Sequence, residues 1–119
     1  MYSDLAQEHI SNPRNLGPME AATDVGTAGA PGEGPFMTLW FEVTEGVIRR
    51  AAFQTYGCAA ATAAGSITTV LLTGRTIEQA LLLTARDIQL VLGGLPEGKE
   101  HCAQLAAEAV QRALTKGVL

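Results

Sequence analysis

The chain has 119 residues, of which 47% are apolar, so we expect one compact domain over residues 1–119 and not a disordered chain. Its formal net charge is −4, and its Lys and Arg residues form no basic stripe, which argues against nucleic-acid binding. No apolar stretch could span a bilayer and no secretory signal is visible, so we expect a cytoplasmic protein that binds no membrane.

Residues 1–35 are expected to hold a short helix followed by a mobile loop rich in Gly and Pro. Ser3 or Asp4 can cap a helix that runs through Ile10. The rest of the region is rich in Asn, Gly and Pro, which predicts a long connection with one short strand near Val25. This region contains five acidic residues and one arginine, so it carries the whole net charge of −4.

The next segment gives the clearest strand signal. Apolar and polar residues alternate over residues 37–44, a period of two that is typical of a strand with one buried face. Glu45 and Gly46 turn the chain, and residues 47–56 return as an antiparallel partner. This strand holds the basic doublet Arg49-Arg50, and we expect both arginines to be solvated rather than to bind phosphate.

Four helices are expected after this hairpin, over about residues 59–72, 77–83, 85–92 and 100–116. Thr76 and Thr84 each open a capping-box pattern, and the last helix shows one apolar stripe. Strands followed by helices predict an α+β fold. We expect a small antiparallel three-stranded sheet with helices packed on one face and a long C-terminal helix.

Cys58 and Cys102 are the two cysteines of the chain, and each lies near the expected start of a helix. Cys58 follows Tyr56 and Gly57, and Cys102 follows His101 directly. Unpaired backbone N–H groups at a helix start favour the thiolate, which binds metal or attacks sulfur. Two thiolates and an imidazole suit zinc, iron or an iron–sulfur cluster, although most such sites need a fourth ligand. Ordinary buried thiols are the alternative.

Four short motifs occur in this chain order: Asn12-Pro13-Arg14-Asn15, Gly29-Ala30-Pro31, Tyr56-Gly57-Cys58 and Lys99-Glu100-His101-Cys102. With them the chain resembles the iron–sulfur cluster assembly scaffold family, found in IscU proteins and at the N-terminus of NifU. The resemblance covers essentially the whole chain. It implies a non-enzymatic scaffold or carrier that accepts persulfide sulfur from a cysteine desulfurase, binds iron and builds a transient [2Fe–2S] cluster for acceptor apo-proteins.

The resemblance also implies roles for particular residues. Cys58, Cys102 and His101 match the metal ligands of the family, and Cys102 or Cys58 would accept the sulfur. Glu33 stands where the first ligand cysteine of the family is expected, and Pro35 replaces an aspartate. A carboxylate can bind zinc or ferrous iron, so we expect zinc or mononuclear iron to bind more readily than a cluster. A solvated loop residue is the alternative for Glu33.

The segment before the second cysteine matches the family in part. Leu95, Pro96 and Lys99 agree with a stretch that an Hsp70-type chaperone recognises in one branch of the family, whereas Glu97 and Gly98 depart from it. The resemblance therefore implies chaperone binding on incomplete matches. A homodimer is a further expectation, because a cluster shared between two chains would make up for the missing cysteine.

Two other functions stay open from the residues. A degenerate family member could act as a regulatory or metal-binding module that assembles no cluster. A thiol enzyme with Cys58 as nucleophile and His101 as base would also need an orienting group and an oxyanion pocket, neither of which the sequence identifies, so we expect no enzyme. The remaining histidine, His9, is expected to be a solvated residue of the first helix.

Overall fold

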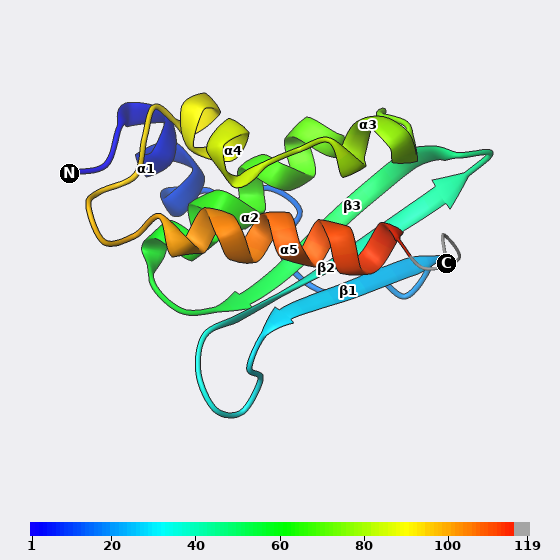
Figure 1. Cartoon of the computed structure of the whole chain (residues 1–119), viewed down its shortest axis with the longest axis horizontal. Coiled ribbons are helices and arrows are strands. Elements are labelled where there is room, and N and C mark those ends of the chain that lie inside the picture. Colours follow the sequence, from blue (N-terminus) through cyan, green and yellow to red (C-terminus); the bar gives the residue numbers. More distant parts are fainter. Residues whose placement is uncertain (116–119) are drawn as a thin grey trace.

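The computed structural model describes residues 1–115, which form a three-stranded antiparallel sheet with helices on one face (Figure 1). In chain order the elements are α1 (Asp4–Ser11), β1 (Asp24–Gly29), β2 (Phe36–Thr44), β3 (Val47–Tyr56), α2 (Ala59–Leu72), α3 (Ile77–Leu81), α4 (Ala85–Leu92) and α5 (His101–Leu114). The predicted α+β fold with a long C-terminal helix is confirmed. Within the described residues, no helix is long and apolar enough to cross a membrane.

The sheet places β2 between β1 and β3, and both pairings are antiparallel. Met37, Leu39 and Phe41 of β2 are fully buried beneath the helices, which is the alternation that the sequence predicted. Glu45 and Gly46 both have positive φ, as a two-residue hairpin turn between twisted strands requires. The strand expected near residue 25 is β1, which pairs along the whole first half of β2.

The two short helices begin at the capping boxes predicted at Thr76 and Thr84. Helix α3 ends at Leu81 and not near Leu83, because Thr84 takes an extended conformation to cap α4 and the chain must leave the first helix before it. Helix α5 is described through Leu114. The predicted end of that helix, Lys116, lies outside the described residues.

Close backbone packing fixes α2 and α5 on the sheet. Most residues of α2 are Ala, Thr, Ser or Gly, and Gly65 faces the ring of Phe53, where an added Cβ would stand 2.3 Å from a ring carbon. Gly26 of β1 lies under α5, where an added Cβ would stand 2.4 Å from the carbonyl oxygen of Ala109. These approaches hold both helices close to the sheet.

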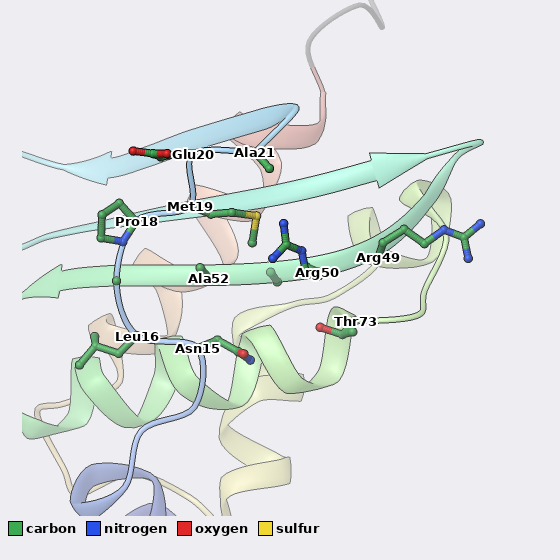
Figure 2. Close-up of a pocket in the computed structure, with 12 residues that line it drawn as sticks. Asn15, Leu16, Pro18, Met19, Glu20, Ala21, Arg49, Arg50, Ala52 and Thr73 are labelled. Atoms are coloured by element: carbon green, nitrogen blue, oxygen red, sulfur yellow. The ribbon is translucent and has the colours of Figure 1, made fainter.

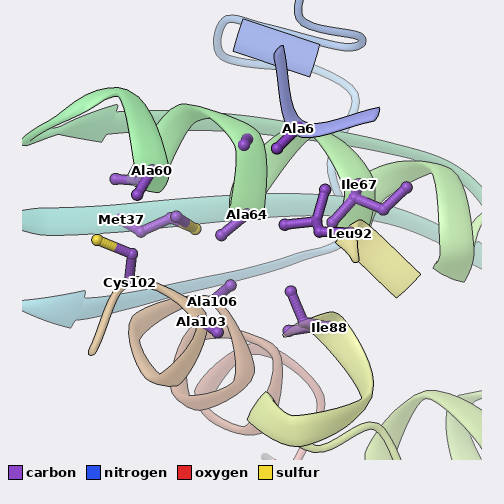
Figure 3. Close-up of a cluster of buried hydrophobic side chains, with 12 residues drawn as sticks. Ala6, Met37, Ala60, Ala64, Ile67, Ile88, Leu92, Cys102, Ala103 and Ala106 are labelled. Atoms are coloured by element: carbon purple, nitrogen blue, oxygen red, sulfur yellow. The ribbon is translucent and has the colours of Figure 1, made fainter. Parts of the chain in front are cut away.

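Cys102 belongs to the hydrophobic core. It is 1% exposed and lies in a cluster that includes Met37 and Ala60 (Figure 3). Cys58 is partly buried and packs against the same cluster. The two thiols are therefore part of the packing between the sheet and the helices, with one of them reaching solvent.

The outer face of the sheet is crossed by residues 15–21 (Figure 2). Leu16 forms a parallel bridge with Phe53, and the Gly17 N–H donates to the Phe53 carbonyl at 2.8 Å, before the chain passes toward β1. Arg49 and Arg50 line the hollow beside this segment, and both are exposed, as predicted. The segment thus carries the chain from α1 to the far edge of the sheet.

His9 is buried, with 4% of its surface exposed, so the expectation of a solvated residue was wrong. Its Nδ1 lies 2.6 Å from the hydroxyl of Ser66 in α2, and the Arg14 N–H donates to the same hydroxyl at 2.9 Å. The Ser66 proton is then available to donate to Nδ1 of a neutral imidazole. The pattern of α1 does not show which of its faces meets α2, so the sequence offered no signal for this contact.

Acidification is expected to destabilise the fold through His9. Burial lowers the pKa of His9, the charge of Arg14 lowers it further and Glu8 opposes them. Because the native pKa lies below the usual 6.5, the unfolded chain binds the proton more readily. The contribution of neutral His9 to the unfolding free energy is therefore complete above about pH 6.5 and is lost as the pH falls through the native pKa.

Urea unfolding of the wild type and of His9→Asn between about pH 5 and pH 7.5 measures this contribution. Asparagine can hydrogen-bond to the Ser66 hydroxyl but does not titrate in this range. The variant should show a flatter dependence of unfolding free energy on pH. An equal slope in both proteins would contradict the assignment to His9.

Candidate metal and sulfur site

Two helix starts bring the two cysteines together. Cys58 is the N-cap of α2 and only Gly57 separates it from the end of β3, whereas Cys102 is the second residue of α5. Their Sγ atoms are 3.6 Å apart, and both thiols are free. A thiolate binds zinc at about 2.3 Å, so two sulfurs at this separation can share one ion. The structure thus assembles the thiol pair that the sequence only suggested.

The buried member of the pair, Cys102, is a weak acid. Burial raises the pKa of the Cys102 thiol to about 12, and the hydrogen bond and the charge of Cys58 act in the same direction. Lys99 opposes this with its positive charge. Cys102 therefore stays protonated near neutral pH, and Cys58 is the thiol of the pair that more readily takes a negative charge.

The partly exposed member, Cys58, is the more acidic thiol. Burial alone would raise the pKa of Cys58, but the backbone N–H of Ala61 and the Cys102 thiol lower it, and the net shift is downward. The N–H of Ala60 and the charge of Lys99 contribute in the same direction. The start of α2 therefore favours a Cys58 thiolate, the form that binds metal and attacks sulfur.

His101 lies beside the pair as the first residue of α5. Its Nε2 is 3.6 Å from Cys102 Sγ, and the side chain is exposed. Glu100, at the N-cap of α5, has helical backbone angles and makes no capping hydrogen bond with its side chain, so this helix start departs from the usual N-cap geometry. The imidazole is close enough to Cys102 Sγ to exchange a proton with it.

Glu33 lies in the loop between β1 and β2, which extends beyond the strands in Figure 1. Its N–H donates to the Ala30 carbonyl at 2.9 Å, and its exposed side chain lines a hollow with Phe36 and Tyr56. Over residues 1–115, no three or more His, Cys, Asp or Glu side chains are arranged to hold a metal ion. The structure therefore gathers neither Glu33 nor His101 with the two thiols into such a group, and the predicted four-ligand set stays a prediction.

The base of this loop nevertheless lies close to the thiol pair. Pro35 Cβ is 3.9 Å from the point where a Cβ on Gly57 would stand, and Gly57 directly precedes Cys58. Phe36 opposes Tyr56 in the ladder, and their rings stack with centroids 6.4 Å apart. Glu33 thus lies two residues before Pro35, which packs beside Gly57 next to the thiol pair.

Sequence reasoning missed the electrostatic role of Lys99. The prediction that Lys99, with Leu95 and Pro96, binds a partner stays a prediction, and the structure adds that its charge acts to lower the pKa of both thiols. All three residues are partly buried, and Leu95 packs against the core cluster that holds Cys102. The available signal was the position of Lys99 three residues before Cys102, at the start of a helix.

The fold and the thiol pair define a small α+β domain that presents two cysteines at the starts of two helices packed on one sheet. The family model of the NifU-like N-terminal domain matches residues 1–117, and the chain belongs to this family. The resemblance noted from four short motifs is therefore confirmed. The replacement of the first ligand cysteine by Glu33 is a separate inference that this match does not address.

Relatives with high identity cover nearly the whole chain. The chain is 47% identical over 114 residues to iron–sulfur cluster assembly scaffold protein IscU 1 of Archaeoglobus fulgidus, covering 96% of this chain and 74% of the relative. It is 43% identical over 117 residues to iron–sulfur cluster assembly scaffold protein IscU of Azotobacter vinelandii, covering 95% and 91%.

Solved structures share the fold at lower identity. A protein assigned to iron–sulfur cluster assembly in the SUF system of Fervidobacterium islandicum superposes with a TM-score of 0.73 at 19% identity, covering 95% of this chain and 96% of that one. The N-terminal part of a NifU-like protein from Brucella abortus gives a TM-score of 0.59 at 20% identity, covering 92% and 77%. These two comparisons support the architecture.

Proposed function

We propose that this chain is an iron–sulfur cluster assembly scaffold or carrier, which holds iron and sulfur at Cys58 and Cys102 before passing them to acceptor proteins. The observation that carries the proposal is the 3.6 Å separation of two free thiols at the starts of α2 and α5. Relatives that cover nearly the whole chain are named as scaffold proteins of this kind, which supports the same role here. Such a role requires no catalytic group.

The ligands of the site would be Cys58, Cys102 and His101, with Glu33 as the fourth when the loop folds over the thiols. Thiolates and imidazole suit zinc, iron and iron–sulfur clusters, and the carboxylate makes the set harder. The cargo would be ferrous iron or a transient [2Fe–2S] cluster, and zinc could occupy the same ligands. Sulfur would be accepted at Cys58 or Cys102.

The proposed function implies several partners. A cysteine desulfurase would supply the sulfur, and acceptor apo-proteins would receive the cluster. An Hsp70-type chaperone would recognise the segment with Leu95, Pro96 and Lys99, and a homodimer could share a cluster between two chains. A reducing cytoplasm is the expected location, since the two thiols must stay free.

Anaerobic reconstitution tests this function. Metal-free protein is incubated with ferrous iron, cysteine and a cysteine desulfurase, and the visible absorbance and the bound iron and sulfide are measured. A scaffold should gain cluster absorbance with iron and sulfide in about equal amounts, as [2Fe–2S] requires. Desulfurase binding without a cluster would instead favour the regulatory module, and failure of both would contradict the proposal.

Replacing Glu33 by cysteine should lengthen the lifetime of a bound cluster by on the order of tenfold, because thiolates are the ligands that hold iron–sulfur clusters most firmly. The measurement is the decay of cluster absorbance after a chelator is added. Glu20→Cys, which adds an exposed thiol on the outer face of the sheet, is the matched control. Equal lifetimes in the two variants would show that residue 33 does not reach the site.

A further inference from the structure

We propose that the two cysteines act together as a dithiol reductant, in which Cys102 attacks a persulfide on Cys58 and releases its outer sulfur as sulfide. The inference rests on the proposed function, because the sulfur must arrive at this site as a persulfide. It adds a chemical step that a passive ligand pair does not perform. The step follows from the positions of three side chains.

The first argument is the difference in exposure between the two thiols. Cys58 is partly exposed at the start of α2, whereas Cys102 is 1% exposed within the core cluster. A persulfide carried by another molecule can therefore reach Cys58 and is kept from Cys102 by the surrounding side chains. Incoming sulfur is then bound at Cys58 first, with Cys102 directly behind it.

The second argument is the separation of the sulfurs. The two Sγ atoms are 3.6 Å apart, and a disulfide needs about 2.05 Å. Cys58 is the N-cap of α2, and its carbonyl accepts from the Ala61 N–H at 3.0 Å, so the sulfurs approach by rotation of the side chains while this turn stays intact. Attack of one thiol on the sulfur of a neighbouring S–S bond is ordinary thiol–disulfide exchange. The thiols are thus positioned for this reaction within one chain.

The third argument is the imidazole beside the attacking thiol. His101 Nε2 lies 3.6 Å from Cys102 Sγ and can take its proton. Cys102 Sγ forms a bond to Cys58 Sγ, the Sγ–S bond of the persulfide breaks, and the outer sulfur leaves with its hydrogen as hydrosulfide. The two thiols lose two electrons and the outer sulfur gains them, so the step needs no further reductant. A low-molecular-weight thiol would then reduce the disulfide and restore the pair.

The composition of the chain makes the outcome well defined. Cys58 and Cys102 are its two cysteines, and the β1–β2 loop carries Glu33 where a third thiol could otherwise compete. An intramolecular disulfide can therefore join only these two residues. The amount of this disulfide formed can therefore be compared directly with the amount of sulfide released.

The experiment uses the full, metal-free, reduced chain, treated anaerobically with glutathione persulfide in the absence of iron and desulfurase. About one sulfide should be released per chain, and intact mass should show a product lighter by two hydrogens that resists alkylation until it is reduced. Cys102→Ala, which keeps a small apolar side chain in the core, should retain the persulfide on Cys58 and release sulfide at least about tenfold more slowly. Circular dichroism confirms that this variant is folded.

A stable persulfide on Cys58 of the wild type, or its transfer intact to Cys102 without sulfide, would overturn the inference. So would unchanged sulfide release in folded Cys102→Ala. His101→Gln provides a second readout, since loss of the proton acceptor should slow release without changing the final disulfide. If the wild type keeps its persulfide yet assembles a cluster in the reconstitution assay, only this inference is contradicted. If Cys58 takes up no sulfur at all, the proposed role of Cys58 as sulfur acceptor is contradicted as well.

Discussion

The Cys58→Ser variant is expected to lose at least about 100-fold in affinity for ferrous iron or zinc, since one of the two thiolates at the site is removed. A serine hydroxyl stays protonated near neutral pH and is a much harder ligand than a thiolate. Cys102 alone is buried in the core and leaves the ion with a single thiolate ligand. Calorimetric titration of the metal-free protein measures this loss.

The same substitution should raise the stability of the metal-free protein. Cys58 is the N-cap of α2 with φ −92° and ψ 178°, and no side-chain hydrogen bond of standard geometry caps the helix, although the N–H groups of Ala60 and Ala61 act on its sulfur. Serine is a preferred N-cap whose hydroxyl can accept from the first free N–H groups, so we expect a gain of about 0.5–1 kcal/mol in unfolding free energy. Urea unfolding checks the gain.

Cys58→Ala is the matched control for both measurements. Alanine removes the thiolate but cannot cap α2, so it should lose metal binding without gaining stability. Strong metal binding by either variant would remove Cys58 from the site. A serine variant that is less stable than the alanine variant would contradict the account of the helix cap.

The Gly26→Ala variant is expected to lose about 3 kcal/mol or more of unfolding free energy. The added Cβ would stand 2.4 Å from the Ala109 carbonyl oxygen, 2.4 Å from the Ala113 nitrogen and 2.8 Å from Ala113 Cα. All three are backbone atoms of α5, which cannot rotate out of the way as a side chain would. The whole helix must therefore move off β1, and the end of the helix layer loses its packing.

Gly34→Ala is the control for this substitution. Neither glycine has a positive φ, so alanine is conformationally acceptable at both positions, and no heavy atom lies within 4 Å of a Cβ built on Gly34. Urea unfolding should therefore give a near-neutral change for Gly34→Ala and a large loss for Gly26→Ala. Similar effects would show that the cost of Gly26→Ala comes from something other than the contact with α5.

The strands and helices followed from local patterns in the sequence. Alternation over residues 37–44 identified β2, and the capping boxes at Thr76 and Thr84 marked the starts of α3 and α4. These signals are readable because each depends on residues close together in the chain. His9 shows their limit, because its burial depends on contact with α2, 57 residues away.

The residues of the candidate site likewise include some that local sequence patterns indicated and some that they did not. Local context indicated that Cys58 and Cys102 would each lie at a helix start, and the family resemblance linked them as ligands. Glu33 was named from the resemblance, but the structure does not bring it into a metal-holding group with the thiols. The effect of Lys99 on both thiols was missed, since its charge acts through space on Cys58, 41 positions earlier in the chain.

By itself the sequence determined the α+β class, the helix starts and the residue types able to bind metal or sulfur. Only the tertiary structure decided that the two sulfurs lie 3.6 Å apart, with one partly exposed and the other buried. The physical reason is that the separation depends on how closely α2 and α5 pack on the sheet. Gly65 and Gly26 set that closeness through contacts with residues far away in the chain, which no local pattern records.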